Sequence, residues 1–212
     1  MTVSYLPVRT PMIVFLDAEG VLREPRDLQS FDAVLRDYPA VSVVITSGQR
    51  AAHALDALRA PFSRDVGRAI VGVTPTITIE GPADRPGSRY REILLYLDER
   101  PSRRWVTLDA DETLFPEACE NLILCENGVD MFASMELQSR LNAALLASVP
   151  VIGHDGRPDY VRLTDIPQPW RDTFRAALRG SCCPAVDGEG ECASATDWKD
   201  WIKGDFPRKN WA

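Results

Sequence analysis

Short apolar runs alternate with helix-like segments along most of this chain. The run Met12–Leu16 holds five consecutive apolar residues, which is typical of a strand covered on both faces in a parallel sheet. The segments between such runs place apolar residues three or four positions apart, as amphipathic helices do. Strands and helices that alternate in this way build right-handed βαβ units. The pattern therefore predicts an α/β fold with one parallel sheet and helices on both of its faces.

The same periodicities locate the individual elements. The predicted strands are Met12–Leu16, Val41–Ile45, Ala69–Val73, Trp105–Leu108 and Leu122–Leu124. The predicted helices are Leu28–Asp37, Arg50–Arg59, Tyr90–Asp98 and Ser134–Leu146. In the last of these helices Leu137, Leu141 and Leu145 share one face, which we expect to be buried.

The sequence changes character at Val149–Pro158, a segment with four Pro or Gly residues. Four of the five tryptophans and all three lysines lie beyond it. The elements predicted there are the helices Trp170–Arg179 and Asp197–Lys203 and a Gly-rich loop at Pro184–Cys192. We expect an α/β domain over residues 1–150. A small, helical, Trp-rich extension over residues 151–212 is expected to pack its aromatic side chains on that domain.

Composition narrows the class of protein. A chain of 212 residues, 45% hydrophobic and 26% charged, is ordinary for a globular protein with one main domain. No apolar run approaches the roughly 20 residues that cross a bilayer, and Met1–Thr10 lacks the apolar core of an export signal. We therefore expect a cytoplasmic protein without a membrane partner, whose five cysteines are reduced thiols. The net charge of −7 argues against binding nucleic acid by overall charge, but it suits an acidic pocket for a divalent cation.

The first predicted strand leads directly into two acids, Asp17 and Glu19, and then into Gly20. The glycine allows a sharp turn at the carboxyl end of the strand, which is where open α/β sheets bind their ligands. Two carboxylates held there can divide the work of phosphoryl transfer. One attacks phosphorus, while the other moves a proton or helps to hold a cation. We predict Asp17 as the nucleophile and Glu19 as the acid–base group.

Two further strand ends carry groups that suit the same chemistry. Thr46 and Ser47 follow the second strand and precede a helix, where hydroxyl and backbone N–H groups can bind phosphate. Capping of that helix is the alternative role for these two side chains. Asp109 follows the fourth strand, and Mg²⁺ prefers hard oxygen ligands of this kind. The predicted magnesium ligands are Asp17, Glu19, Asp109 and Asp111.

From Met12 to Phe115 the sequence resembles the haloacid dehalogenase (HAD) superfamily. In this resemblance Asp17 matches the nucleophile of the first motif, and Asp109 matches the metal-binding acid of the fourth motif. Thr46 or Ser47 matches the second motif. The resemblance implies a Rossmann-like fold and a Mg²⁺-dependent phosphatase that forms an aspartyl-phosphate.

The third HAD motif is usually a lysine that contacts the transferred phosphoryl group. The first lysine of this chain is Lys199, far beyond the matching region. Arg89 is the expected substitute, because it precedes a predicted helix and carries the same charge on a planar group. Arg91 is the second choice, and a surface position beside the helix is the alternative for either arginine.

Three segments are similar to a bacterial HAD subgroup that is related to the HAD domain of multidomain RNA-repair proteins. These segments are Val43–Arg50, Val71–Pro75 and Arg104–Asp109. Two departures from the family pattern indicate weak or altered activity. Glu19 replaces an aspartate and is one methylene longer, which shifts a general acid by roughly 1 Å. Ala110 replaces a second acid beside Asp109.

The spacing of the motifs bears on the substrate. About 29 residues separate Asp17 from Thr46, and about 43 separate Thr46 from Arg89, which is too few for a folded cap domain. A capless or minimally capped site suits a phosphate on a large substrate, such as a nucleic-acid end or a protein. The alternatives are a degenerate, non-catalytic HAD-fold module that binds a partner through its Trp-rich tail, and a phosphorylated receiver domain.

Overall fold

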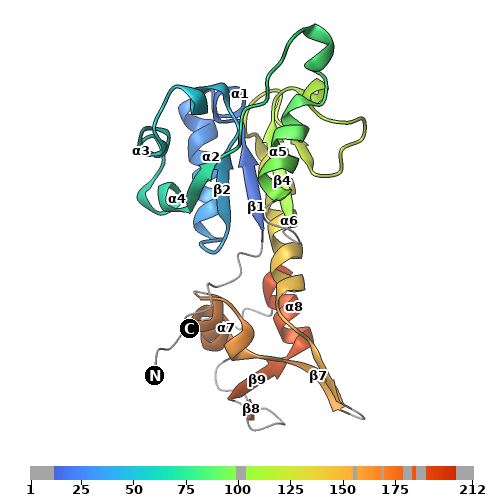
Figure 1. Ribbon diagram of the computed structural model, residues 1–212. Coiled ribbons are helices and arrows are strands. Elements are labelled where there is room, and N and C mark those ends of the chain that lie inside the picture. The colour runs from blue at the N-terminus through green and yellow to red at the C-terminus, as the bar shows by residue number, and fades with distance from the viewer. Residues whose placement is uncertain are drawn as a thin grey trace, which may run out of the picture. The chain divides into compact units, whose positions relative to one another are not determined.

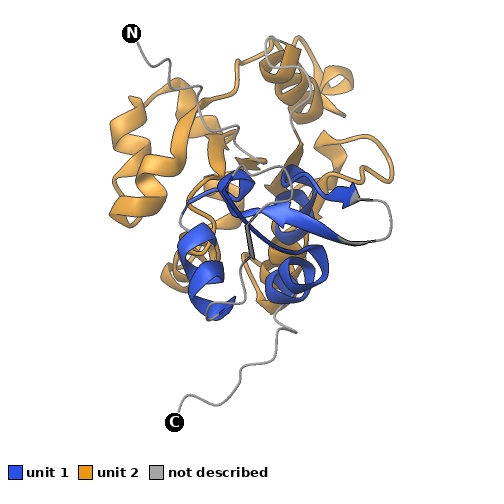
Figure 2. Ribbon diagram, turned by 90° about the horizontal axis from the view of Figure 1, so that it is seen from below, with its two compact units in different colours: residues 1–8, 142–212 blue, residues 9–141 orange. Residues whose placement is uncertain are grey.

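The structure is a computed structural model that describes residues 12–98, 104–154, 157–168, 170–178, 183–184 and 190–203 (Figure 1). The chain divides into two compact units (Figure 2). The larger unit comprises residues 9–141, and the described residues from 142 onward belong to the smaller unit. Residues 185–189 of the predicted Gly-rich loop, and Arg179 at the end of a predicted helix, lie outside the described residues.

Five short strands form a parallel sheet in the larger unit. They are β1 (Ile13–Leu16), β2 (Ser42–Ile45), β3 (Ile70–Val73), β4 (Trp105–Asp109) and β5 (Leu122–Leu124). Their order across the sheet is β3-β2-β1-β4-β5, and every pairing is parallel. The central strand β1 is wholly buried, as its apolar run predicts. The predicted α/β class is confirmed. From β1 the chain adds β2 and β3 on one side of the sheet and then β4 and β5 on the other. Such folds bind ligands at the point where the strand order reverses, which here lies beside β1.

The helices of the larger unit are short, apart from α2, α5 and α6. The α-helices are α1 (Ala18–Val21), α2 (Pro25–Arg36), α3 (Leu55–Arg59), α4 (Arg64–Ala69), α5 (Ser88–Asp98) and α6 (Met131–Ser148), the last of which continues into the smaller unit. The 3₁₀ turns are η1 (Gly48–Ala51), η2 (Pro82–Asp84) and η3 (Glu112–Leu114). The three leucines predicted to share a face of α6 are all buried. Among the described helices, none combines the length and apolar character that crossing a bilayer requires.

Helices cover both faces of the sheet, as predicted. On one face Val44 lies in an apolar cluster with Ile93 of α5. On the other face Ile45 lines a cavity together with Leu28 of α2 and Leu58 of α3. Successive side chains of a strand point to opposite faces, so these two contacts place α5 on one side of β2 and α2 with α3 on the other.

The predicted helix Arg50–Arg59 is wrong. The chain instead forms η1, then an extended residue at Ala54 (φ −65°, ψ 152°), and only then α3. The side chain of Arg50 bends back and donates hydrogen bonds to the carbonyl groups of Thr46 and Ser47. The extended backbone of Ala54 separates η1 from α3, so a continuous helix does not form there.

No separate cap domain lies between Asp17 and Arg89, where every residue is described. The chain between them forms only elements of the larger unit: α1, α2, β2, η1, α3, α4, β3 and η2. The capless form predicted from the motif spacing is therefore confirmed for this part of the chain.

The smaller unit contains an antiparallel sheet that the sequence did not predict. Its strands are β6 (Ile152–His154), β7 (Arg157–Arg162), β8 (Cys183–Pro184) and β9 (Glu191–Ser194), in the order β6-β7-β9-β8. The Pro- and Gly-rich segment interpreted as a break thus contributes β6 and the beginning of β7. These strands are short and mixed in polarity, so pairing with neighbours decides their conformation more than their own pattern does.

Besides its sheet, the smaller unit contains α7 (Trp170–Leu178), α8 (Ala195–Lys203) and the 3₁₀ turn η4 (Leu163–Asp165). Aromatic side chains of α7 and α8 pack together and, with aliphatic residues such as Leu163 and Ile166, form its core. The rings of Trp198 and Trp201 are stacked with centroids 5.5 Å apart. Phe174 meets them at centroid distances of 5.2 Å and 5.4 Å. The Trp-rich helical extension is confirmed, and its aromatic side chains pack against one another.

Candidate active site

Polar side chains gather where the parallel strands end. Asp17 follows β1, Thr46 follows β2, Thr74 follows β3, and Asp109 is the last residue of β4. The pairing registers place these positions level with one another at one edge of the sheet. All four residues are buried, with exposed fractions of 9%, 0%, 2% and 0% in the order given. The structure thus brings together three residues that the sequence singles out, Asp17, Thr46 and Asp109.

The backbone at these positions is fixed by the sheet. The N–H of Asp17 donates to the carbonyl of Leu108 (3.0 Å), and the N–H of Thr46 donates to the carbonyl of Leu16 (2.9 Å). Both bonds continue the strand ladders by one residue. The reactive side chains therefore start from backbone that is as constrained as the sheet itself, which suits a preorganised site.

Gly20 makes room for the carboxylate of Asp17. A Cβ atom at position 20 would lie 2.2 Å from Oδ2 of Asp17 and 3.4 Å from the Cβ of Ala110. A hydrogen bond from the Gly20 backbone also favours the charged form of Asp17. The backbone of position 20 lies so close to the Asp17 carboxylate that any side chain there would displace it, so this position requires glycine.

Asp17 and Asp109 are buried carboxylates within range of each other's charge. Burial raises the pKa of the Asp17 carboxyl above its ordinary value, although the Arg89 guanidinium acts in the opposite direction. Burial, and next the charge of Asp17, raise the pKa of Asp109 to about 6. Two acids that repel each other in a buried place form a natural site for a cation, because a cation stabilises the charged form of both.

Arg89, the first of the two predicted motif-three arginines, reaches this site from α5. Its Nε lies 3.2 Å from Oδ2 of Asp109, and its Nη1 lies 3.5 Å from Glu92. Its side chain is only 12% exposed. Arg91, the second choice, is exposed and donates to the carbonyl of Asp84. The structure therefore favours Arg89 as the cation beside the acids.

Arg50 is a buried residue of the site to which the sequence analysis gave no role. Its side chain is 5% exposed and forms a 2.6 Å ion pair with Glu92, which also contacts Arg89. It donates as well to the carbonyl groups of Ser47 (2.9 Å) and Thr74 (3.2 Å), and so ties the ends of β2 and β3 together. Its position directly after the polar end of the second strand was the available signal, but the sequence alone does not separate a buried arginine from a surface one there.

Five buried hydroxyl groups have no hydrogen-bond partner among the described residues. Two of them, those of Ser63 and Thr107, lie elsewhere in the larger unit, and the other three, those of Thr46, Ser47 and Thr74, directly follow β2 and β3. Ser47 is the N-cap residue of η1, yet its side chain makes no capping hydrogen bond. An unpaired buried hydroxyl group costs about 1–3 kcal/mol, and such groups are normally satisfied by water or a ligand. Three of them at the ends of neighbouring strands form a polar cradle that suits the oxygen atoms of a phosphate.

Glu19 reaches from α1 to the loop that follows β2. Its Oε2 accepts a hydrogen bond from the backbone N–H of Gln49 (3.1 Å). A Cβ atom at Gly48 would lie 3.2 Å from the same oxygen, so the glycine leaves room for the longer acid. Glu19 is exposed while Asp17 is buried, which gives its carboxylate access to both solvent and the site.

The carboxylate of Asp111, a predicted metal ligand, is engaged by other partners. It accepts hydrogen bonds from the N–H and the hydroxyl of Thr113 (3.1 Å and 2.5 Å) and pairs with Arg85 at 3.2 Å. The bond from the Thr113 hydroxyl is the main reason that the pKa of Asp111 is lowered. Its N–H donates to Oδ1 of Asp109 (3.0 Å). Within the described part of the chain, no group of three or more His, Cys, Asp or Glu side chains is arranged to hold a metal ion.

The sheet order and the polar residues at its strand ends define a HAD-like domain: an acid after β1, hydroxyl groups after β2 and an acid at the end of β4. A family model described as the HAD domain in Swiss Army Knife RNA repair proteins matches residues 13–131. The match covers more than half of the chain, and the protein belongs to this family. Comparisons with curated proteins and with solved structures give no match. Membership of the family supports a phosphohydrolase-like role.

Proposed function

We propose that this protein is a Mg²⁺-dependent HAD-type phosphohydrolase that works through an aspartyl-phosphate on Asp17. One observation carries the proposal. Two buried acids, Asp17 and Asp109, end neighbouring strands beside buried hydroxyl groups that lack a partner among the described residues. Such acids supply a nucleophile and ligands for a cation, and such hydroxyl groups bind the oxygen atoms of a phosphate.

The proposed reaction has two steps. A carboxylate oxygen of Asp17 attacks phosphorus, the bond between phosphorus and the ester oxygen breaks, and Glu19 donates a proton to that departing oxygen. Glu19 then takes a proton from a water molecule, whose oxygen attacks the same phosphorus and releases inorganic phosphate and Asp17. Glu19 suits this exchange because it is exposed and because the N–H of Gln49 holds its Oε2.

The residues present fit a magnesium ion. Asp17 and Asp109 offer hard oxygen ligands, and after burial the charge of Asp17 is the main cause that raises the pKa of Asp109. These two acids would hold the ion, and the chemistry that it would supply is to screen the negative charges of the nucleophile and the phosphate. We propose that Glu19 and Asp111 contribute through water, because both carboxylates already have protein partners.

The phosphate is proposed to bind on the side of the site formed by β2 and β3. The hydroxyl groups of Thr46, Ser47 and Thr74 would donate to its oxygen atoms and so gain the partners that they lack. Arg89 would supply positive charge from α5, where it already lies beside Asp109. Arg50 would act indirectly, since its hydrogen bonds go to backbone carbonyl groups and fix the loop.

We further propose that the phosphate is carried by a large molecule, a nucleic-acid end or a protein. The described chain between Asp17 and Arg89 has no cap domain that would enclose a small metabolite. The family is described by its occurrence in RNA repair proteins, which favours a nucleic-acid end.

The test is release of inorganic phosphate, with and without Mg²⁺, from p-nitrophenyl phosphate and from oligonucleotides with a 5′ or 3′ phosphate. Asp17→Asn is expected to lower kcat/KM by at least about 10³-fold, because an amide cannot act as the nucleophile. Asp98→Asn, at the exposed end of α5, is the matched control and should keep wild-type activity. Equal rates for wild type and Asp17→Asn would rule out the proposed nucleophile.

A second candidate is a non-catalytic HAD-fold module. The observation in its favour is that Asp109 is already engaged by Arg89 and by the N–H of Asp111. Trp198 is buried, so its side chain does not serve as the partner anchor that this alternative first suggested. Calorimetric titration with Mg²⁺ separates the two candidates, because the module predicts no binding heat and no turnover.

A further inference from the structure

A cavity of about 630 Å³ opens beside the proposed active site, between the segment that contains α1 and α2 and the segment that contains η1 and α3. Its lining includes Glu19, Gln49, Leu28, Ile45, Leu58 and Phe62. The first two also form the hydrogen bond that holds the proposed acid–base group, so the cavity adjoins the proposed site at Glu19. Its volume lies in the range typical of pockets for molecules of nucleotide size.

Phe62 belongs to the lining of this cavity and also to that of a second hollow, of about 370 Å³. The ring is half-buried and meets Phe31 of α2 nearly edge to face, with centroids 6.2 Å apart. This contact with a buried ring holds Phe62 in place on the side that faces the core. A flat aromatic group therefore stands where the two hollows meet.

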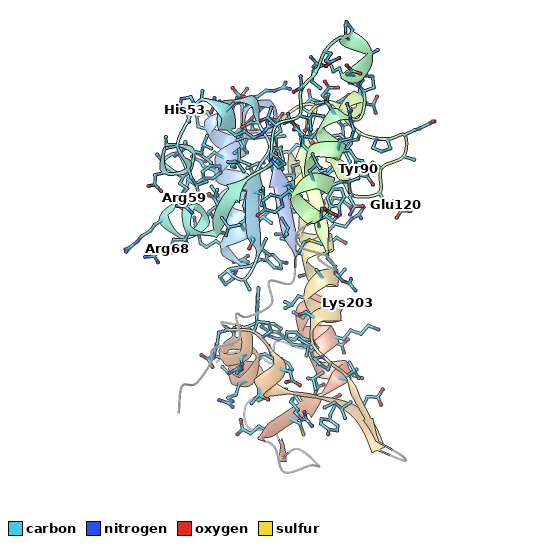
Figure 3. All side chains as sticks on the ribbon, in the orientation of Figure 1. His53, Arg59, Arg68, Tyr90, Glu120 and Lys203 are labelled. Carbon is cyan, nitrogen blue, oxygen red and sulfur yellow. The ribbon has the colours of Figure 1, made fainter. Side chains whose placement is uncertain are left out.

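The second hollow is rich in arginine. Its lining includes Arg59, Arg64 and Arg68, and Figure 3 shows Arg59 and Arg68 on the flank of the larger unit formed by α3 and α4. Arg59 is held by the carbonyl group of Ile70 and by Asp56. Arg64 and Arg68 are exposed, and neither side chain forms an ion pair or a hydrogen bond with another described residue. Two uncommitted cations in a protein of net charge −7 indicate a local site for an anion.

We propose that the two hollows bind the end of a single-stranded nucleic acid. The terminal phosphate lies at Asp17, the terminal base occupies the cavity against Phe62, and the next phosphate lies at Arg64 and Arg68. The proposal rests on the proposed function for the placement of the terminal phosphate. An acid site, an aromatic ring and a group of arginines match the alternation of phosphate and base along such a strand, which a peptide backbone does not share.

The first experiment removes the aromatic ring. Phe62→Leu keeps an apolar side chain against Phe31, so the fold should be retained, which the Tm of the variant checks. We expect KM for a phosphorylated hexanucleotide to rise about tenfold, as loss of one stacked base predicts. The kinetic constants for acetyl phosphate, which carries neither a base nor another aromatic ring, should remain those of the wild type.

The second experiment removes the uncommitted charges. In the double variant Arg64→Ser/Arg68→Ser, KM for the hexanucleotide should rise, and the slope of log KM against log salt should fall by about 1. Arg36→Ser, which removes an exposed arginine from the end of α2, is the matched control and should leave both quantities unchanged.

The readouts separate this inference from the proposed function. If the wild type does not hydrolyse p-nitrophenyl phosphate, the proposed function fails, and fluorescence anisotropy of the labelled hexanucleotide then tests the two hollows alone. Weaker binding by Phe62→Leu and by the double arginine variant supports the inference. Unchanged hexanucleotide KM and affinity in both variants would overturn it. Tighter binding of a phosphopeptide than of the hexanucleotide would also overturn it, in favour of a protein substrate.

Discussion

The two units of this protein bury different kinds of side chain. The buried residues of the larger unit include charged and hydroxyl groups: Asp17, Asp27, Asp32, Thr46, Ser47, Thr74, Glu92, Thr107 and Asp109. The buried residues described in the smaller unit are apolar, aromatic or cysteine, among them Val161, Phe174 and Trp198. A buried polar group lowers stability unless it is paired, so a cluster of such groups marks a place kept for a ligand or a reaction.

The location of the buried polar residues indicates that the two units have different roles. Most of the buried polar residues in the larger unit lie at the carboxyl ends of β1, β2, β3 and β4 or on the arginine network beside them. The smaller unit buries what a small domain needs for its own stability, a packed set of aromatic rings. We therefore expect catalysis to depend on the larger unit. Substitutions that weaken the packing of the smaller unit should leave turnover unchanged.

Removal of the Trp198 ring from the core of the smaller unit tests whether the two units have different roles. Trp198 is 1% exposed and contacts both Phe174 and Trp201. Trp198→Ala should lower the free energy of unfolding of the smaller unit by about 4 kcal/mol, because it deletes a large buried side chain. Hydrolysis of p-nitrophenyl phosphate should be retained. Thermal unfolding followed by near-ultraviolet circular dichroism, together with the activity assay, measures both.

Lys199→Ala is the matched control for that experiment, because Lys199 is exposed on the same helix and should change stability by no more than about 0.5 kcal/mol. Loss of turnover in Trp198→Ala at a temperature where the larger unit stays folded would contradict the assignment. The smaller unit would then have to contribute to the site.

The second prediction concerns the buried ion pair between Arg50 and Glu92 in the larger unit. Arg50→Met should lower the free energy of unfolding by about 3 kcal/mol, because it breaks a buried ion pair with Glu92 and leaves carbonyl groups such as that of Thr74 unpaired. Chemical denaturation measures the change.

A double variant separates charge from packing. Arg50→Met/Glu92→Leu removes both charges and should recover part of the loss, since no uncompensated carboxylate then remains between the two strands and α5. If the double variant were no more stable than Arg50→Met alone, the ion pair would not be the source of the effect. Arg36→Met, an exposed arginine, should behave as the wild type.

The sequence predicted the framework of the site well, for a physical reason. Buried strands such as β1 consist of uninterrupted apolar residues, so the first polar residue after each, Asp17 or Thr46, marks the end of the strand. In a parallel sheet those ends meet at one edge, and the convergence follows from topology. β4 departs from this pattern, since it contains the polar Thr107 and includes Asp109 as its last residue, one position beyond the predicted end at Leu108.

What the sequence did not predict depends on tertiary contacts. The buried pair of Arg50 and Glu92 has the composition of a surface pair, and only the packing of α5 against the strand ends reveals it. The same holds for β6 and β9, whose residues become strands because a partner is available. The start of α2 at Pro25, earlier than the predicted start at Leu28, could have been predicted from the sequence. Pro25 and the reciprocal capping of Glu24 with Asp27 are signals that mark the beginning of a helix.

The last prediction concerns the contribution of Asp109 to the free energy of unfolding, which changes with pH. Burial, and next the charge of Asp17, raise the pKa of Asp109 from an ordinary value of 3.8 to about 6 in the folded protein. Between these values the folded state binds more protons than the unfolded state, so stability in the absence of metal falls as pH rises from about 4 to 6. Asp109→Asn does not titrate, and at pH 7 with chelator it should be more stable than the wild type. The rise in pKa sets an upper limit of about 3 kcal/mol on this gain, which loss of the ion pair with Arg89 reduces.

Asp111→Asn is the matched control with the opposite sign. The pKa of Asp111 is lowered in the folded state, first by the bond from the Thr113 hydroxyl, so its stabilising contribution is present at neutral pH and is lost as pH falls. This variant should therefore be less stable than the wild type at pH 7, whereas Asp109→Asn should be more stable. Urea unfolding from pH 4 to 7 measures both differences. If Asp109→Asn were destabilised at pH 7 in the presence of chelator, the buried acids would not repel each other, and the argument for a cation between them would lose its basis.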